Sequence, residues 1–451
     1  MNQKNILTFC RKAINFGFYS LAFFSPLSIS ATQIALSIIL LSWIVLMISE
    51  KRVIFAKNPL NYPIFAYVCA VIIASLFGVN FIHSLKLINK LWITLTFFAM
   101  LTFIEDMRIL RRLIHILLIV TSIASVYGVL QHLFPGLDIT RPEGRKVIQW
   151  TVEGGIASTG FFDHHMTYGG FLLLVFSLSF SLSVVSLTTK LLPQEMGFDN
   201  KGLLSGESSQ ISLIFYIPLT TLILGGLISS MTRNAWFGSL CAASLIIILS
   251  TVHILFRSKR LIGYSGAGFI LLCVTAYSLF TFIFPLQNPL IMRFKSIFDV
   301  SKNVERVYIW KSSIDMIMDH PLTGVGFNNY TEAIKGYRSN YSHTFSPGSD
   351  AHAHNNILTQ TAELGIIGLT AFLWIWIRFF KEGVKMYLNP PNPSKGGEGG
   401  FQRAIIIGGL GAIFGFHIAG MFEGNFGDAE VATMVWFTMG LVFLINKKEE
   451  V

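Results

Sequence analysis

Three basic residues stand beside long apolar segments, where a charged side chain needs a partner or water. Lys86 and Lys90 are four residues apart near the start of one segment, and Arg233 precedes another. Four-residue spacing puts two side chains on one face of a helix. A cation at the edge of a membrane is costly unless it is paired or faces a wet cavity. These residues therefore indicate either a bound anion or side chains that extend to the lipid headgroups.

A second group of polar residues, DAHAHNN at 350–356, precedes a later apolar segment. Asp350, His352 and His354 are metal-ligand types, and the H-x-H spacing suits zinc on a strand. No Cys or Glu partner stands at a metal-site spacing from them, so we predict no metal centre.

Two further polar clusters have roles that stay open. Residues 163–165 (DHH) stand where a polar loop meets an apolar segment, and they either line a substrate or anchor the chain at the membrane interface. Glu423 and the two acidic residues after it are typical of a solvated turn. The alternative is that these carboxylates orient Arg233 or His354.

The composition excludes an ordinary soluble domain. Charged residues make up 13% of the chain, against roughly 25% in a typical globular protein. Hydrophobic residues make up 53%. The net charge of +10 is attributed to cytoplasmic loops, because no nucleic-acid-binding motif is present.

Apolar stretches long enough to span a membrane recur along the whole chain. A spanning helix needs about 20 mostly apolar residues. Such stretches occur at 14–30, 31–49, 60–79, 84–104, 113–134, 164–189, 211–229, 235–256, 262–284, 361–380, 403–421 and 430–446. The first two are divided near Pro26, since about 36 residues would overrun one crossing. We therefore predict an all-α polytopic membrane protein with about 12 transmembrane helices.

The basic residues orient these helices. Lys and Arg gather in alternate loops, and such loops lie on the cytoplasmic side. This places both termini and a linker near 386–402 in the cytoplasm, and two long loops, 135–163 and 285–360, outside. The predicted organisation is helices 1–9 in 1–284, a large outer loop in 285–360, and helices 10–12 in 361–451.

The larger outer loop is too long to be structureless. Within it, Val307, Trp310, Ile314 and Ile317 recur at the spacing of one helix face. Pro321 then stops the pattern. We predict an amphipathic helix over 304–319 with these residues on its apolar face.

The same loop ends in a spaced motif. His354-Asn355 is followed by nine residues, then Gly365, two residues and Gly368. This motif resembles the signature of the O-antigen ligase family, which shares a domain with O-antigen polymerases. Other segments agree in order, namely SMTRNAW at 230–236, RVYIW at 306–310, HPLTGVGFNNY at 320–330 and NFGDAEV at 425–431. The first 230 residues match the family only in topology.

The resemblance implies a metal-independent glycosyltransferase of the inner membrane. The donor would be a glycan on undecaprenyl diphosphate at the periplasmic face. The acceptor would be lipid A–core in a ligase, or another lipid-linked glycan in a polymerase. No cofactor and no nucleic-acid partner are implied. The chain also lacks the D-x-D pair and the G-x-x-x-x-G-K-[ST] phosphate loop of nucleotide chemistry.

The family histidine corresponds to His354, and the family arginine to Arg233. An attacking hydroxyl must lose a proton, so His354 is expected to act as a general base or, alternatively, to bind a sugar or phosphate. The fork of Arg233 suits the diphosphate leaving group. Gly365 and Gly368 are expected to allow close helix packing and to aim the His354 end of the helix. The remaining expected substrate-binding residues are Arg306, Lys86, Lys90, Asn355 and His352.

Three functions fit these patterns. A single dominant outer loop favours a ligase, because polymerases often carry two loops of similar size. A secondary transporter of small anions would place charges and broken helices at the membrane midplane, in paired halves. The unusual cations lie instead near the outer boundary, which disfavours transport.

Overall fold

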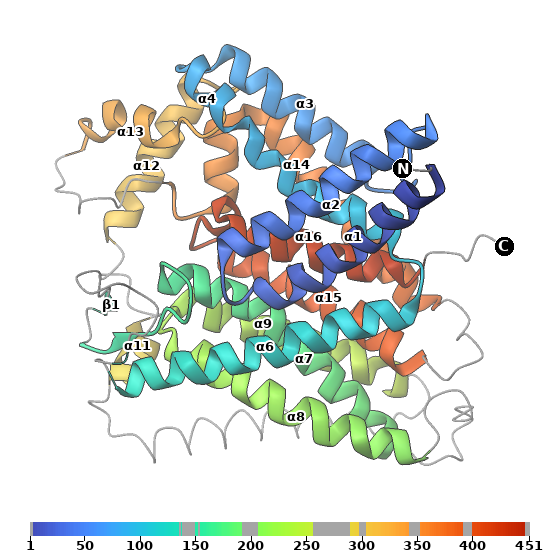
Figure 1. The fold of residues 1–451 in the computed structure, drawn as a ribbon. Helices are drawn as coiled ribbons and strands as arrows, with labels where there is room; N and C mark the ends of the chain where they lie inside the picture. The colour runs from blue at the N-terminus through green and yellow to red at the C-terminus, as the bar shows by residue number, and fades with distance from the viewer. Residues whose placement is uncertain are drawn as a thin grey trace. The chain divides into compact units, whose positions relative to one another are not determined.

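The protein is described here from a computed structural model, drawn as a ribbon in Figure 1. The structure describes residues 3–134, 137, 149–151, 154–191, 206–255, 289–296, 304–341, 352–390 and 399–446. They form two compact units. Unit 1 comprises Met1–Leu117, Val300–Asn389 and His417–Val451, and unit 2 comprises Leu118–Asp299 and Pro390–Phe416.

Unit 1 is built from helices of three separate stretches of chain. The first stretch contains α1 (Gln3–Phe24), α2 (Ile29–Glu50), α3 (Asn61–Phe77), α4 (Phe81–Leu87), the 3₁₀ helix η1 (Ile88–Thr94), α5 (Leu95–Phe103) and the beginning of α6 (Met107–Leu133). The second contains α12 (Val304–Asp319), α13 (Tyr330–Arg338) and α14 (Asn356–Leu388). The third contains the end of α15 (Gly399–Gly420), the 3₁₀ helix η5 (Asn425–Gly427) and α16 (Ala429–Leu444).

Unit 2 contains the rest of α6 and α15 and the elements between them. These are β1 (Gln149–Trp150), β2 (Ile156–Ala157), α7 (His165–Leu191), α8 (Gly206–Ser229), α9 (Arg233–Leu255) and α11 (Pro289–Lys295). The two short strands pair antiparallel, with Gln149 opposite Ala157. All other elements of the described part of this unit are helices.

The turn between α1 and α2 lies where it was predicted. Pro26 stands in this turn, and the Ser28 side chain caps α2 by accepting a hydrogen bond from the Ala31 N–H. The two helices then lie side by side (Figure 1). The predicted division of 14–49 into two segments is therefore confirmed, although α1 begins earlier than predicted.

Seven helices in the described ranges are long and apolar enough to cross a membrane, which confirms an all-α membrane protein. They are Ile29–Glu50, Phe81–Phe103, Met107–Leu133, His165–Thr188, Arg233–Thr251, Asn356–Leu388 and Gly399–Gly420. Three shorter apolar helices, Asn61–Phe77, Ile214–Ser229 and Ala429–Leu444, coincide with further predicted spans. The predicted span 262–284 lies outside the described residues, so the total of about 12 stays a prediction.

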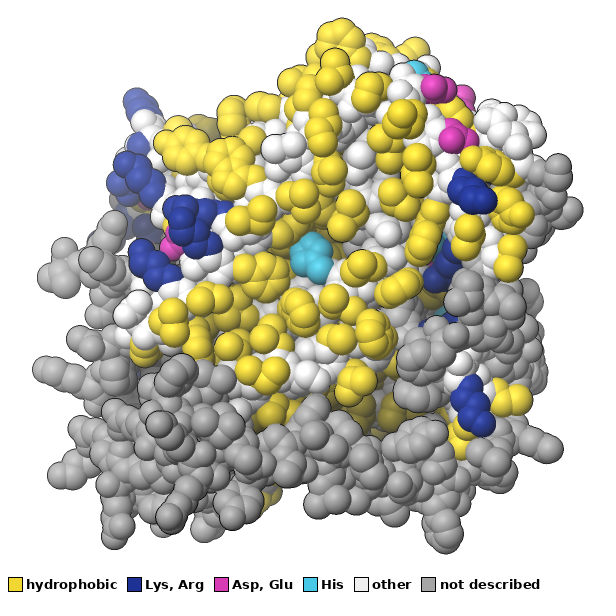
Figure 2. Space-filling model, turned by 180° about the vertical axis from the view of Figure 1, so that it is seen from behind, with side chains coloured by type: hydrophobic (Ala, Val, Ile, Leu, Met, Phe, Trp, Pro, Cys, Tyr) yellow, Lys and Arg dark blue, Asp and Glu magenta, His cyan; other side chains and the backbone are white. Residues whose placement is uncertain are grey.

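Apolar side chains also face outward. Figure 2 shows hydrophobic side chains over much of the coloured surface, with Lys and Arg gathered in separate groups. Ile48 and Phe65, for example, are 70% and 68% exposed. An extensive apolar surface of this kind is expected where lipid, rather than water, surrounds the helices.

The helix that follows the histidine motif is broken near its start. Gly365 has φ 63° and ψ −166°, which no helix contains. Residues 321–326 lie against this break. Two of their N–H groups donate to carbonyls just before Gly365, and two of their carbonyls accept from N–H groups just after it. α14 therefore consists of two helices, 356–364 and a longer one, 366–388, which we call its outer and inner helix after the predicted topology.

Glycine is required at this junction. A Cβ on Gly365 would lie 2.2 Å from the Leu322 carbonyl oxygen, and its φ and ψ belong to a region that is essentially restricted to glycine. Gly324 and Gly326 also have positive φ values and lie close to backbone atoms. The close approach expected at Gly365 thus exists, but the partner is a loop rather than a second helix.

The loop helix α12 begins and ends where it was predicted, but it buries a different face. Ile309 and Met316 are fully buried, whereas Val307 and Ile314 are 38% and 50% exposed. The predicted apolar face is therefore wrong at Val307 and Ile314, whereas Ile317 packs against the buried cluster as predicted. Aliphatic residues line both sides of this helix, and contacts from α13 and the outer part of α14, at Ile334 and elsewhere, select the buried side.

Candidate functional site

The structure places His354 immediately before the outer helix of α14, as the sequence predicts. Asn355 is the N-cap: its side chain accepts from the Leu358 N–H at 3.0 Å and donates to the Met421 carbonyl at 3.1 Å. His354 itself has φ 48°, in the left-handed region. This conformation is uncommon for residues other than glycine, so neighbouring contacts must hold it.

The connection that follows α15 brings a buried carboxylate to this histidine. Glu423 is only 4% exposed. Its Oε1 lies 3.1 Å from Nδ1 of His354 and 3.3 Å from Nε2 of His352, and it accepts from the Gly424 N–H at 3.1 Å. Burial excludes a solvated turn for Glu423 and supports the alternative, a partner of His354. The sequence feature that could have pointed to Glu423 is its position two residues before the NFGDAEV segment.

Arg306 completes this cluster from α12. One of its terminal nitrogens donates to the Phe422 carbonyl at 2.7 Å, and the other lies 3.5 Å from Oε2 of Glu423. Oε2 accepts no hydrogen bond from a described residue, so the guanidinium supplies its compensating charge. The cluster then contains one negative and one positive charge, and its two histidines need not be protonated to balance the carboxylate.

The pKa of Glu423 reflects these neighbours. Burial raises it, but the hydrogen bond from His354 and the nearby His352 and Arg306 together outweigh burial and hold the pKa well below its ordinary value. Glu423 is therefore an ionised acceptor at neutral pH.

The hydrogen bonds assign the proton positions in both imidazole rings. Nδ1 of His352 accepts from the backbone N–H of His354 at 3.0 Å. A neutral imidazole has one donor and one acceptor nitrogen, so Nε2 of His352 carries the proton and donates to Glu423. Nδ1 of His354 faces the same carboxylate and must also be a donor. The basic lone pair of His354 is therefore on Nε2.

The same three groups have the spacing of a metal site. Ligand atoms of His352, His354 and Glu423 all lie within 4.8 Å of one another. Sequence spacing reveals no carboxylate partner for these histidines, yet the fold supplies one. The donors nevertheless fit a cation poorly, because the Nδ1 lone pair of His352 already accepts an N–H and Arg306 lies beside the carboxylate. Asp350 lies outside the described residues.

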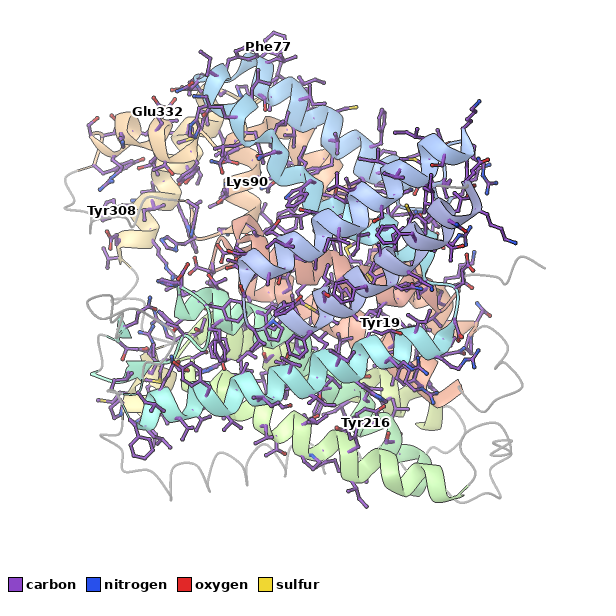
Figure 3. All side chains as sticks on the ribbon, viewed as in Figure 1. Tyr19, Phe77, Lys90, Tyr216, Tyr308 and Glu332 are labelled. Carbon is purple, nitrogen blue, oxygen red and sulfur yellow. The ribbon has the colours of Figure 1, made fainter. Side chains whose placement is uncertain are left out.

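The two lysines of the predicted site lie in different kinds of helix. Lys86 lies in the last turn of α4, whereas Lys90 is in η1, where a 3₁₀ helix turns by about 120° per residue. The predicted shared helix face is therefore wrong. Lys90 donates to the Asn328 side chain at 2.9 Å. Asn328 comes shortly after residues 321–326, which pack against the break in α14. Figure 3 shows Lys90 at the end of unit 1 that also carries Glu332 of α13.

Arg233 lies in unit 2, at the first position of α9. It donates to the Ser296 carbonyl at 2.9 Å and to the Ser296 hydroxyl at 3.2 Å. Arg293, which sequence reasoning missed, is 8% exposed and donates to the Met231 carbonyl at 3.1 Å. His165 contacts the Ser230 carbonyl at 3.0 Å. These contacts fix the start of α9, and with it the backbone from which Arg233 projects.

The fold and this cluster define a polytopic membrane protein with a histidine–carboxylate centre on a broken helix. Residues 218–373 match the family model described as O-Antigen ligase. The chain therefore carries an O-antigen ligase domain over these residues, and the resemblance indicated by its motifs is confirmed.

Named relatives agree with this family. A putative polysaccharide ligase of Rickettsia bellii is 26% identical over 244 residues, which cover 54% of this chain and 56% of that protein. A putative polysaccharide ligase of Rickettsia conorii is 26% identical over 307 residues, which cover 66% of this chain and 71% of that protein. The alignment with the Rickettsia bellii protein thus spans little more than half of its length.

Proposed function

We propose that this protein is an O-antigen ligase, a glycosyltransferase of the inner membrane. It transfers a glycan from undecaprenyl diphosphate to a lipid A–core acceptor at the periplasmic face. The family domain and the polysaccharide ligase names of its relatives support this class of reaction. The observation that carries the proposal is the 3.1 Å contact between Nδ1 of His354 and buried Glu423, which fixes a proton acceptor at the start of α14.

In this mechanism, Nε2 of His354 accepts the proton of the acceptor hydroxyl. The hydroxyl oxygen bonds to the anomeric carbon of the donor glycan, and the bond from that carbon to the diphosphate oxygen breaks. Undecaprenyl diphosphate leaves with the electron pair. Glu423 stabilises the imidazolium that forms on His354. A positioned general base contributes about 10²–10⁴-fold in rate.

Cationic side chains stabilise the charge that develops on the leaving diphosphate. Arg306 has five N–H donors, and the contacts recorded in unit 1 engage its two terminal nitrogens without using all of them. Arg233 acts on the diphosphate from the N-terminus of α9, where backbone N–H groups also favour anions. Contacts with the described residues use one of the two amide N–H groups of Asn355, and we assign the other to a substrate. Lys86 and Lys90, both exposed, attract the anionic donor.

The reaction as proposed needs neither a divalent metal nor a nucleotide. The energy of transfer lies in the glycosyl diphosphate, and Arg306 and Arg233 supply the positive charge that a metal would otherwise bring. Transfer by the purified protein should therefore continue in excess chelator. Activity that chelator abolishes and zinc restores would instead assign the His352–His354–Glu423 cluster to a metal.

Deleting the gene in its own host tests the proposed function. A ligase predicts loss of every ladder band of lipopolysaccharide on a gel while lipid-linked polymer accumulates. A polymerase, the alternative within the same family, predicts a band with a single repeat. An unchanged ladder would contradict both enzyme functions and leave the secondary transporter of small anions as the remaining hypothesis.

The proposed topology has both termini in the cytoplasm and the His354 cluster in the periplasm. A reporter that is active only in the periplasm should be active when fused at Ser346 and silent when fused at Gly397. The reverse pattern would place the site on the wrong side of the membrane for a periplasmic donor.

A further inference from the structure

We propose that His352 is a positioning residue that holds His354 in its reactive geometry, rather than a ligand of the substrate. The proposal rests on the proposed function of His354 as the base. It is carried by the simultaneous contacts of the His352 ring with the backbone of His354 and with Glu423. Sequence reasoning placed His352 among the substrate-binding residues, because nothing in the spacing reveals these contacts.

The first contact supports an unfavourable backbone. His354 has φ 48°, a backbone conformation that is unfavourable for a residue with a side chain. Nδ1 of His352 accepts the His354 N–H at 3.0 Å and so closes a turn around Ala353. In this turn the His354 ring faces Glu423, with Nδ1 3.1 Å from the carboxylate. Without the acceptor at residue 352, the left-handed backbone of His354 loses the bond that favours it.

The residue between the two histidines is fixed independently. Ala353 is fully buried, its N–H donates to the Thr359 hydroxyl at 3.2 Å, and its carbonyl accepts from Nε1 of Trp310 at 2.9 Å. α12 and the outer helix of α14 therefore clamp the middle of the turn. His352 and His354 are then the two ends of a rigid support, and their rings lie 4.5 Å apart at an interplanar angle of 67°.

Through the second contact, the His352 ring shares the Glu423 carboxylate with the His354 ring. Nε2 of His352 lies 3.3 Å from Oε1 of Glu423, the atom that also contacts His354 at 3.1 Å. Both nitrogens of the His352 ring are engaged in this way, one as acceptor and one as donor. A neutral His352 therefore has neither a lone pair for proton transfer nor a second N–H for a phosphate.

The two roles of His352 make opposite kinetic predictions. A positioning residue acts on the geometry of the base, so its loss lowers kcat and leaves the KM for the donor unchanged. A substrate ligand contributes to binding, so its loss raises KM. A misplacement of about 1 Å at a reacting group can lower the rate about 10²-fold.

The test compares His352→Ala and His352→Asn in purified full-length protein reconstituted in nanodiscs. The donor probe is the lipid-linked glycan that accumulates in the deletion strain, and the acceptor is its lipid A–core. We expect His352→Ala to lower kcat about 10–10²-fold with unchanged KM. We expect His352→Asn to recover most of this loss, because an Asn oxygen readily accepts the N–H two residues further on. His83→Ala, at an exposed histidine of α4, is the control and should behave as wild type.

Three results would overturn the proposal. A raised KM with unchanged kcat in both variants would make His352 a substrate ligand. Equal loss of kcat in His352→Ala and His352→Asn would show that the bond to the His354 N–H does not matter. The proposed function is tested separately, because it predicts that His354→Gln is inactive. An active His354→Gln would contradict the proposed function. An inactive His354→Gln together with a fully active His352→Ala would contradict only the positioning role of His352.

Discussion

Two histidines of this protein stand at the start of helices and differ in the group that orients them. His354, before α14, has Nδ1 3.1 Å from the Glu423 carboxylate, and its side chain is 17% exposed. His165, at the start of α7, is 8% exposed overall, and its Nδ1 contacts the Ser230 carbonyl at 3.0 Å and the Thr232 hydroxyl at 3.2 Å. One ring is oriented by an anion, the other by neutral groups.

Under the proposed function, this difference separates a reactive histidine, His354, from a structural one, His165. A carboxylate stabilises the positive charge that a ring gains when it takes up a proton. A backbone carbonyl fixes the ring as effectively but favours its charged form much less. His165 also receives a hydrogen bond from the Thr232 hydroxyl to its own carbonyl at 2.9 Å. These contacts join His165 to the SMTRNAW segment, and the two roles expected for residues 163–165, lining a substrate or anchoring at the membrane interface, both stay predictions.

The largest effect is expected for the histidine that faces the carboxylate. His354→Gln should lower transfer about 10²–10⁴-fold, the range of a general base, because an amide cannot accept a proton at neutral pH. Radiolabelled glycan transfer by purified protein measures this loss. Binding of the lipid-linked donor should be retained, since it depends mainly on the cations, and a large drop in donor affinity would make His354 a binding residue instead.

Removing the anion that orients His354 should have the next largest effect. Glu423→Gln keeps the shape of the side chain but removes the charge that stabilises the imidazolium. We expect kcat to fall about 10²-fold, as for the loss of one preorganised group at a transition state. Wild-type kcat in Glu423→Gln would show that the carboxylate is only structural and would remove the distinction between His354 and His165.

Arg233→Lys tests the arginine at the start of α9, the helix end that the His165 contacts hold in place. Lysine keeps the charge but loses the planar fork that binds two phosphate oxygens at once. We expect a loss of roughly 10-fold or more, since one decade corresponds to about 1.4 kcal/mol, the scale of a single charged hydrogen bond. The measurement is kcat/KM for the lipid-linked donor at matched expression. Near wild-type activity would reduce Arg233 to a general cation or a membrane anchor.

His165→Phe should change stability rather than catalysis. It keeps an aromatic ring and removes both ring nitrogens, which leaves the buried Ser230 carbonyl without this donor. Loss of such a bond is worth about 1–3 kcal/mol of unfolding free energy. Thermal unfolding in detergent should show a lower midpoint, while activity per folded molecule stays near wild type. A loss of activity at unchanged stability would assign His165 to the substrate.

The smallest expected effect is a pH dependence of stability that comes from Glu423. Its pKa is lowered in the folded protein, below the ordinary value of about 4.3 in the unfolded chain. The resulting stabilisation is fully present above the unfolded pKa and is lost as the pH falls through the lowered pKa. The difference in unfolding midpoint between wild type and Glu423→Gln should therefore shrink as the pH falls below about 4. An equal difference at pH 7 and pH 3 would contradict this origin.

Local sequence determined much of the fold and the first half of the site. The bounds of α12 follow from its periodicity and from the proline after it, and the α1–α2 turn follows from segment length and Pro26. The position of His354 at a helix start follows from the spaced motif. These features depend on residues within one or two helical turns, where backbone preferences and hydrophobic spacing act directly.

Only the tertiary structure decided which distant residues contact His354, α12 and Gly365. Glu423 lies 69 residues from His354, and no periodicity relates two such positions. The buried face of α12 was only partly predicted, because aliphatic residues occupy both sides and contacts with α13 and α14 select the buried side. Gly365 is recognisable as a glycine, but its need for a left-handed backbone arises from residues 321–326, which supply the hydrogen bonds that the break leaves open. A buried polar group must be paired, and the chain satisfies that requirement with whichever distant group its packing brings near.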